Sequence, residues 1–228
     1  MDERMLERLS AYYRDLSRTD TLAGKCSMSL PPQLSGLRVI DVLCRSGKGA
    51  FKLSDAVGDA GFVLGIDPDK SCIERAIAAA SGNHRSGHGW SRYLRFEQAF
   101  PENLAQAGVS DASYDVVYAN CGLADVFDLR AALAEFHRCL KPGGFLWVAE
   151  GVFRSASGYE DRVSEEPAPV QAAPHSALTI DAFADVCREA GFGCVEVADV
   201  ASVPLGELAL PEGCERTSLV VADIKATV

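Results

Sequence analysis

A buried strand that carries a carboxylate and runs into a glycine-containing turn is the feature that most constrains the fold of this chain. Residues 38–43 read Arg-Val-Ile-Asp-Val-Leu, and Asp41 is followed by a turn that reaches Gly47 and then by a helical pattern. This order of strand, turn and helix opens the ligand crevice of doubly wound α/β domains, where the backbone of the turn contacts a cofactor. The sequence therefore predicts an α/β chain with a doubly wound, Rossmann-like sheet.

The turn keeps part of the glycine pattern that such loops carry. In the form acid-x-Gly-x-Gly-x-Gly, Asp41 is the acid and Gly47 the last glycine, whereas Leu43 and Arg45 occupy the two earlier glycine positions. We expect the side chains of Leu43 and Arg45 to crowd a ligand that approaches the backbone, because glycine is the residue that leaves this space open.

Length and charge limit the domain count and the partners. With 228 residues, 48% of them apolar, the chain can form one α/β domain with a sizeable core. We expect a single domain over 1–228, with a helical cap over 1–36 and a lid or connection over 152–176. A net charge of −10 disfavours binding to nucleic acid or to an anionic membrane. Small-molecule ligands are favoured, and the oligomeric state is left open.

The N-terminus indicates where the protein is found. Residues 1–8 are charged throughout and lack the apolar core of a signal peptide, and no apolar run reaches membrane-spanning length. We therefore expect a cytoplasmic protein.

Alternating apolar and amphipathic segments predict seven strands. The expected strands are 38–43, 62–67, 93–97, 114–119, 145–150, 194–200 and 217–224, and the expected helices are 49–60, 70–80, 129–140 and 180–190. The turn at 141–144, Lys-Pro-Gly-Gly, should feed the fifth strand. The last two strands are expected to form an antiparallel pair at the sheet edge.

Taken together, these features resemble class I S-adenosylmethionine-dependent methyltransferases. The resemblance rests on the seven strands with alternating helices, the acid that ends the second strand, and the Leu-Lys-Pro-Gly-Gly segment at 140–144. Within that class the chain is similar to the arsenite methyltransferase branch. The segments that carry this closer similarity are Tyr12-Tyr13, 20–26 with Cys26, 115–123 with Asn120-Cys121, and 213–218. The resemblance covers about residues 10–226 and implies S-adenosylmethionine as cofactor and a small-molecule acceptor.

The cofactor-binding residues follow from this resemblance and from their chemistry. A carboxylate at the tip of the second strand can accept hydrogen bonds from both ribose hydroxyls, so Asp67 is the strongest candidate; it could also cap the helix after Pro68, and the two roles are compatible. The segment 99–104 would close over adenine, with Phe100 stacking on the ring, although Pro101 offers no backbone donor. The complete candidate set is Asp41, Cys44, Gly47, Asp67, Pro68, Phe100, Pro101 and Asn120.

Cysteines are the candidate catalytic residues. Trivalent arsenic binds soft thiolates, and Cys26 and Cys121 match two of the four cysteine positions of the branch, whereas Ala50 and the segment around Ala173 lack the others. Cys44 in the turn is expected to serve local packing more than ligand binding, and Cys214 to be structural.

No metal site is expected. His84 and His88 lie in a glycine-rich loop without a nearby third ligand.

Two hypotheses remain. The first is a methyltransferase that transfers a methyl group by direct displacement to a small or soft, thiol-bound acceptor, a reaction that requires no strong general base. The alternative is a methyltransferase-like binding or regulatory protein that has lost catalysis, as suggested by Leu43, Arg45, Pro101 and the two absent cysteines.

Overall fold

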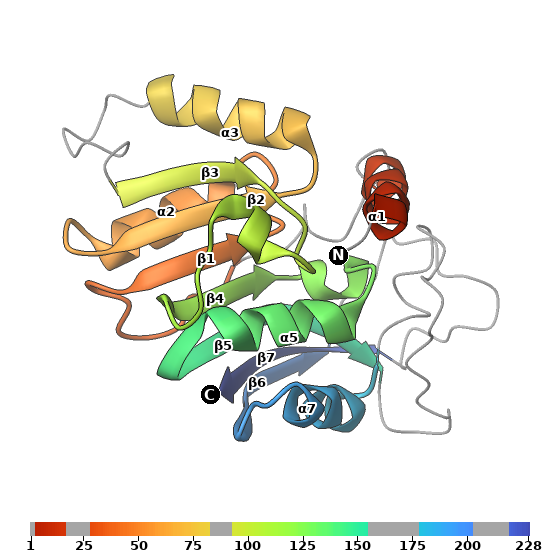
Figure 1. Ribbon diagram of the computed structural model, residues 1–228. Coiled ribbons are helices and arrows are strands. Elements are labelled where there is room, and N and C mark those ends of the chain that lie inside the picture. The colour runs from red at the N-terminus through yellow and green to blue at the C-terminus, as the bar shows by residue number, and fades with distance from the viewer. Residues whose placement is uncertain (1–2, 17–27, 83–92, 155–177, 203–218) are drawn as a thin grey trace.

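A computed structural model describes residues 3–16, 28–82, 93–154, 178–202 and 219–228. These residues contain one seven-stranded sheet with the strand order β3-β2-β1-β4-β5-β7-β6 (Figure 1). The strands are β1 (Arg38–Val42), β2 (Phe62–Asp67), β3 (Leu94–Gln98), β4 (Tyr114–Asn120), β5 (Leu140–Arg154), β6 (Cys194–Ser202) and β7 (Leu219–Thr227). The predicted doubly wound, seven-stranded sheet is confirmed.

The strand order reverses beside β1. This strand pairs in parallel with both β2 and β4, and β3 and β5 extend the parallel part outward on either side. β7 is antiparallel to β5 and to β6, which confirms the expected antiparallel pair at the edge. In open α/β sheets a ligand binds outside the carboxyl ends of the strands at such a reversal point, so the fold alone directs attention to the ends of β1 and β4.

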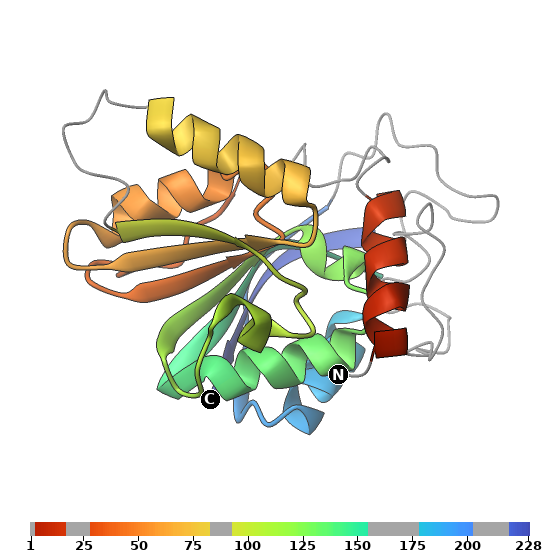
Figure 2. The ribbon, with the colours of Figure 1, turned by 45° about the horizontal axis from the view of Figure 1, so that its top comes forward.

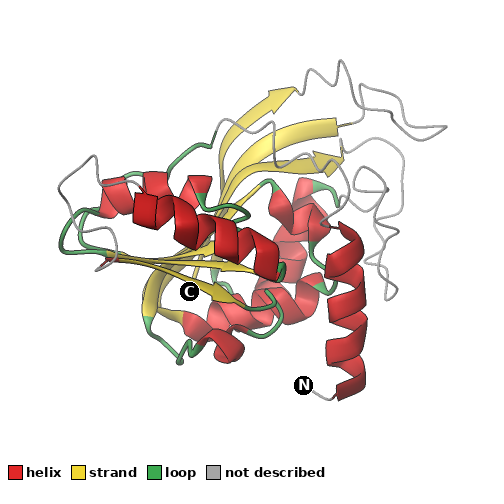
Figure 3. Ribbon diagram, turned by 90° about the horizontal axis from the view of Figure 1, so that it is seen from above, coloured by secondary structure: helices red, strands yellow, loops and turns green. Residues whose placement is uncertain are grey.

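Helices cover both faces of the sheet (Figure 3). They are α1 (Glu3–Leu16), α2 (Lys48–Val57), α3 (Lys70–Gly82), α5 (Leu129–Cys139) and α7 (Ile180–Glu189), with short 3₁₀ helices η3 (Leu104–Ala107) and η4 (Gly122–Asp125). Residues of α2 and α3 share one apolar cluster with the sheet, and residues of α1, α5 and α7 share the other. α1 lies at the end of the sheet to which the parallel strands point (Figures 1 and 2).

Alternation along the central strands explains these two cores. Val39 and Val63 face the α2–α3 cluster, whereas their neighbours Ile40 and Leu64 face the α5–α7 cluster, and all four are almost completely buried. A strand covered on both faces requires apolar residues at successive positions, which is why the sequence predicted these strands well.

The element boundaries differ from the prediction where glycines and pairing decide them. α2 ends at Val57 because Gly58 adopts a positive φ of 65°, three residues before the glycine that the sequence pattern favoured. β5 is much longer than expected because residues 140–144 already belong to it, with a register shift opposite Tyr114, and because its far end pairs with β7. Of the expected lid over 152–176, residues 152–154 belong to β5 and the rest lies outside the described residues.

None of the described helices is long and apolar enough to cross a membrane.

Candidate functional site

The turn after β1 has left-handed backbone at all three glycine positions of the pattern, although only the third of them is a glycine. Leu43, Arg45 and Gly47, which occupy the three glycine positions of the pattern, have φ angles of 55°, 52° and 83°. A left-handed conformation costs an ordinary residue roughly 1–2 kcal/mol, so the turn keeps its shape at two strained positions. At Gly47 a side chain is excluded, because a Cβ atom would lie 2.8 Å from the ring of Phe96.

The two replacements have different surroundings. Leu43 is buried in the apolar cluster on the α5–α7 face of the sheet, and the crowding of an approaching ligand by its side chain stays a prediction. A residue in the left-handed conformation directs its side chain differently from a strand residue, and the sequence pattern did not show which way it would turn. Arg45 keeps 27% of its side chain exposed.

Asp67, at the end of β2, holds two loops together. Its Oδ2 accepts a hydrogen bond from the backbone N–H of Arg45 at 2.9 Å, and its Oδ1 accepts one from the N–H of Asp69 at 2.9 Å, just before α3. Burial raises the pKa of Asp67, and the two amides and the charge of Arg45 counteract that rise. The residue that caps α3 is Asp69, whose Oδ1 accepts a hydrogen bond from the N–H of Ser71 at 2.8 Å, whereas Asp67 bonds the residue before the helix. Because each carboxylate oxygen of Asp67 has a second lone pair, the predicted ribose contact is compatible with these bonds and stays a prediction.

The neighbouring residues of the candidate set support the same corner of the site. The carbonyl oxygen of Pro68 accepts a hydrogen bond of 2.9 Å from the side-chain amide of Gln98 at the end of β3. This bond ties the tips of β2 and β3 together and positions the following segment, 99–104.

Two buried acceptors at the ends of β1 and β4 have no hydrogen-bond partner among the described residues. They are Oδ2 of Asp41 and Oδ1 of Asn120. Burial, followed by the nearby charge of Asp67, raises the pKa of Asp41 to about 8, and the N–H of Ala50 opposes that rise. Buried polar atoms are normally paired, and exceptions point to a role or to a missing partner. Acceptors of this kind suit a ligand that carries a positive charge or N–H donors.

An ion pair spans the carboxyl ends of the two central strands. Nη2 of Arg45, in the turn after β1, lies 3.6 Å from Oδ2 of Asp125, in η4 after β4. Asp125 is buried, which raises its pKa to about 6 although Arg45 lowers it. Arg45 thus lies between a carboxylate that holds its backbone and another that holds its side chain.

Helix α1 is fastened to the loops on this edge by two tyrosines. The hydroxyl of Tyr13 donates to Oε1 of Glu102 at 2.8 Å and accepts a bond from the N–H of Phe127, while the hydroxyl of Tyr12 donates to the carbonyl oxygen of Asp125 at 3.1 Å. The tyrosine pair was noticed in the sequence, but Glu102 and Asp125 were not. A single buried carboxylate does not follow the hydrophobic periodicity from which sequence predictions are made. Its role becomes visible only when the structure shows which donors bond to it.

The predicted adenine segment lies beneath α1. Phe100 is buried, and its ring packs against Tyr13 with 5.8 Å between the ring centroids. One side of the ring is therefore covered by Tyr13. Stacking of Phe100 on adenine and the lost donor at Pro101 remain predictions.

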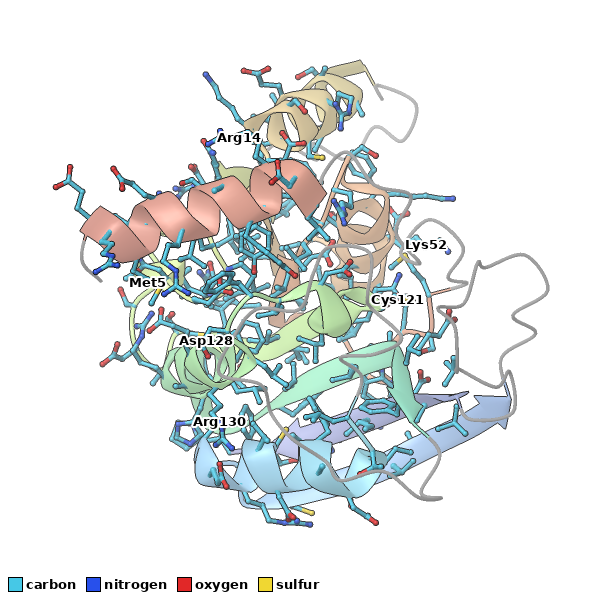
Figure 4. The ribbon with its side chains drawn as sticks, turned by 90° about the vertical axis from the view of Figure 1, so that its right-hand side faces the viewer. Met5, Arg14, Lys52, Cys121, Asp128 and Arg130 are labelled. Carbon is cyan, nitrogen blue, oxygen red and sulfur yellow. The ribbon has the colours of Figure 1, made fainter. Side chains whose placement is uncertain are left out.

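The cysteines of the set occupy different surroundings. Cys44 is buried, with its Sγ so close to β2 that a Cβ on Gly65 would lie 3.1 Å from it, and burial raises the pKa of its thiol well above the usual range. It fits packing rather than ligand binding. Cys121 follows β4 beside η4 (Figure 4), with a positive φ of 54° and its Sγ 3.4 Å from the carbonyl oxygen of Glu150. Its sulfur is disulfide-bonded. Cys26 and Cys214 lie outside the described residues.

A pocket of ≈ 430 Å³ lies to one side of this crevice, between α1, the start of η3 and the first turns of α5. It is lined by Met5, Leu9, Glu102, Asn103, Asp128, Ala131 and Glu135. Figure 4 shows Met5 on α1 and Asp128 at the N-terminus of α5, the two helices that border the pocket. Two of its lining residues, Glu102 and Asn103, belong to the segment 99–104 that was predicted to close over adenine. In the described ranges no three histidine, cysteine or acidic side chains gather as a metal site would require.

Comparison with known proteins gives a consistent result. Residues 33–191 match the model of a methyltransferase domain. The mouse arsenite methyltransferase is 34% identical over 137 residues, which cover 60% of this chain and 36% of that protein. A demethylmenaquinone methyltransferase of Staphylococcus aureus is 35% identical over 117 residues, or 50% of this chain and 43% of that protein. The chain spans about a third of the length of the arsenite methyltransferases that it matches.

A solved structure extends the comparison to the whole fold. The arsenic(III) S-adenosylmethionine methyltransferase from Chlamydomonas reinhardtii superposes with a TM-score of 0.71 and 24% identity, covering 94% of this chain and 72% of that one. At this identity the superposition demonstrates a shared fold.

Proposed function

Because the chain belongs to the methyltransferase-domain family, with 33–191 matching the family model, we propose that it is an S-adenosylmethionine-dependent methyltransferase. The observation that carries this proposal is the convergence of Asp41, Asp67 and the left-handed turn after β1 at the point where the strand order reverses. That point is where open α/β sheets bind their ligands.

The residues present fit this donor. It carries a ribose, a sulfonium, an ammonium and a carboxylate. Asp67 would hold the ribose, and the unpartnered acceptors of Asp41 and Asn120 would receive N–H donors of the ammonium. Phe100 and Pro101 would border the adenine. When bound, the donor supplies an electrophilic methyl group on sulfur, and the protein binds, orients and excludes water.

The acceptor we propose is a small or soft, thiol-bound molecule. Support comes from the similarity to arsenite methyltransferases and from the position of Cys121 at the end of β4, next to the crevice. With Cys26 and Cys121 as the matched cysteines, and with the disulfide of Cys121 reduced, at most two protein sulfurs would hold trivalent arsenic. Monomethylated arsenic, which needs two thiolates, should then bind better than arsenite.

A second candidate function is a methyltransferase-like binding protein without catalysis. The Arg45–Asp125 ion pair favours it, because this pair crosses the crevice that the donor would enter.

Methyl transfer under reducing conditions tests the proposal. Wild type, Cys121→Ser and Cys187→Ser should be assayed with methylarsenite, arsenite and small thiols as acceptors. Cys187 is a buried, free cysteine on α7 and serves as the matched control. We expect turnover that Cys121→Ser abolishes and Cys187→Ser preserves. Donor binding without turnover of any acceptor would favour the second candidate.

A further inference from the structure

We propose that Arg45 binds the carboxylate of the donor's amino-acid part, and that Asp125 holds the guanidinium in place until that carboxylate arrives. The inference rests on the proposed donor site. It assigns a specificity-determining role to a residue that stands where the loop pattern has glycine.

The backbone of Arg45 is held in one place and in an unusual conformation. Its backbone N–H is held by Asp67 at 2.9 Å, and its φ of 52° places it in the left-handed region. Strained backbone at the edge of a crevice persists only where the surrounding structure enforces it and is concentrated at functional sites. The side chain therefore leaves the turn from a defined point, between the expected ribose position at Asp67 and the end of β4.

The ion pair between Arg45 and Asp125 is longer than a hydrogen bond. The 3.6 Å between Arg45 and Asp125 is beyond hydrogen-bond range, whereas Arg138 and Glu135 approach to 2.7 Å elsewhere in the described structure. A guanidinium prefers two parallel hydrogen bonds to one carboxylate. The contact with Asp125 does not have that geometry, so a ligand carboxylate that forms two parallel bonds would compete favourably with Asp125 for the guanidinium.

Apart from Arg45, the crevice carries acidic side chains, which complement the positive groups of the donor but not its carboxylate. Asp41, Asp67 and Asp125 are all buried at this edge of the sheet, which suits the sulfonium and ammonium of the donor. The ionised carboxylates of Asp67 and Asp125 repel the carboxylate of the donor. Arg45 supplies a positive charge at the turn that would contact the amino-acid part of such a ligand. This charge offsets the repulsion between the acidic side chains and the ligand carboxylate.

The test compares two ligands that differ only in this group. S-adenosylmethionine and its decarboxylated form are titrated calorimetrically into wild type, Arg45→Met and Arg95→Met. Arg95 is a matched control, because it lies on β3 in an exposed ion pair with Glu97. We expect wild type and Arg95→Met to prefer S-adenosylmethionine by about tenfold or more, and Arg45→Met to bind both ligands within about twofold of each other.

Asp125→Asn provides a second measurement that does not remove Arg45. Because this change removes the competing carboxylate, and because the decarboxylated ligand loses an attractive charge, it should increase the preference for S-adenosylmethionine over the decarboxylated ligand several-fold. Retention of the wild-type preference in a folded Arg45→Met protein would overturn the assignment while leaving the donor site intact. Failure of wild type to bind either ligand would instead contradict the proposed function, and the assignment with it.

Discussion

The carboxylate of Asp67 accepts a hydrogen bond from the backbone N–H of Arg45 at 2.9 Å. The acid that ends β2 therefore fixes the turn that follows β1, and it also accepts a hydrogen bond from the N–H of Asp69, the residue that precedes α3. The two sides of the expected cofactor crevice are thus coupled through one side chain. Changes at Asp67 should alter the shape of the turn as well as its affinity for a ligand.

Asp67→Asn should destabilise the protein even without ligand. An amide presents only one acceptor oxygen, so one of the two backbone amides loses its partner, and a hydrogen bond to a charged group is worth about 1.5–3 kcal/mol. Urea unfolding should show a loss of that order. An exposed carboxylate provides the control: Asp55→Asn, on α2, should change the free energy of unfolding by less than about 0.5 kcal/mol. A loss no larger than that of the control would mean that Asp67 does not anchor the turn.

Leu43→Gly should destabilise the protein although it restores the glycine pattern. The substitution relieves left-handed strain of about 1 kcal/mol but removes a buried leucine, which typically costs about 2–5 kcal/mol. We expect a net loss of about 1–3 kcal/mol in thermal or urea unfolding. A more stable variant would show that the side chain of Leu43 contributes little to the core.

Tyr13→Phe should loosen α1 from the sheet edge more than Tyr12→Phe does. Tyr13 is buried and bonds to the carboxylate of Glu102, whose second oxygen has no partner among the described residues, whereas Tyr12 bonds to a backbone carbonyl. We expect losses of about 1.5–3 and 0.5–1.5 kcal/mol respectively. Hydrogen exchange of residues 3–16 should increase in Tyr13→Phe. Equal effects of the two changes would contradict a special role for the Tyr13–Glu102 pair.

Asp41 should make stability depend on pH in the direction opposite to that of a salt-bridged acid. Burial raises its pKa from the ordinary value of 3.8 to about 8, so between these values the folded protein holds a proton that the unfolded chain has released. Stability should therefore fall as the pH rises through this window.

The measurement for Asp41 is a comparison of Asp41→Asn with wild type at about pH 5.5 and about pH 8.5. Relative to wild type, the variant should gain about 1 kcal/mol or more at the higher pH, since one pKa unit corresponds to about 1.4 kcal/mol. Asp55→Asn, which removes an exposed carboxylate on α2, is measured alongside as the control for the loss of a surface charge. A pH-independent difference for Asp41→Asn would indicate that Asp41 titrates normally.

The parts of the fold that the sequence predicted are those governed by local pattern. The central strands are mostly apolar, and the two carboxylates stand out because Asp41 interrupts the apolar run of β1 and Asp67 ends that of β2. The Tyr13–Glu102 bond joins residues that are 89 positions apart in the sequence, and the Arg45–Asp125 pair joins segments that are similarly distant. The direction of the Leu43 side chain depends on an unusual backbone angle. Long-range contacts and left-handed backbone at residues other than glycine leave no pattern in the local sequence, so these features could not be predicted from it.

The most direct test of the central claim is calorimetric titration of S-adenosylhomocysteine into wild type, Asp67→Ala and the exposed control Asp55→Ala. We predict binding to wild type and Asp55→Ala with one site per chain, and no detectable binding to a folded Asp67→Ala protein, because a lost charge-assisted bond adds to a loosened turn. Unchanged binding to Asp67→Ala, or no binding to wild type, would contradict a donor site at the carboxyl ends of β1, β2 and β4.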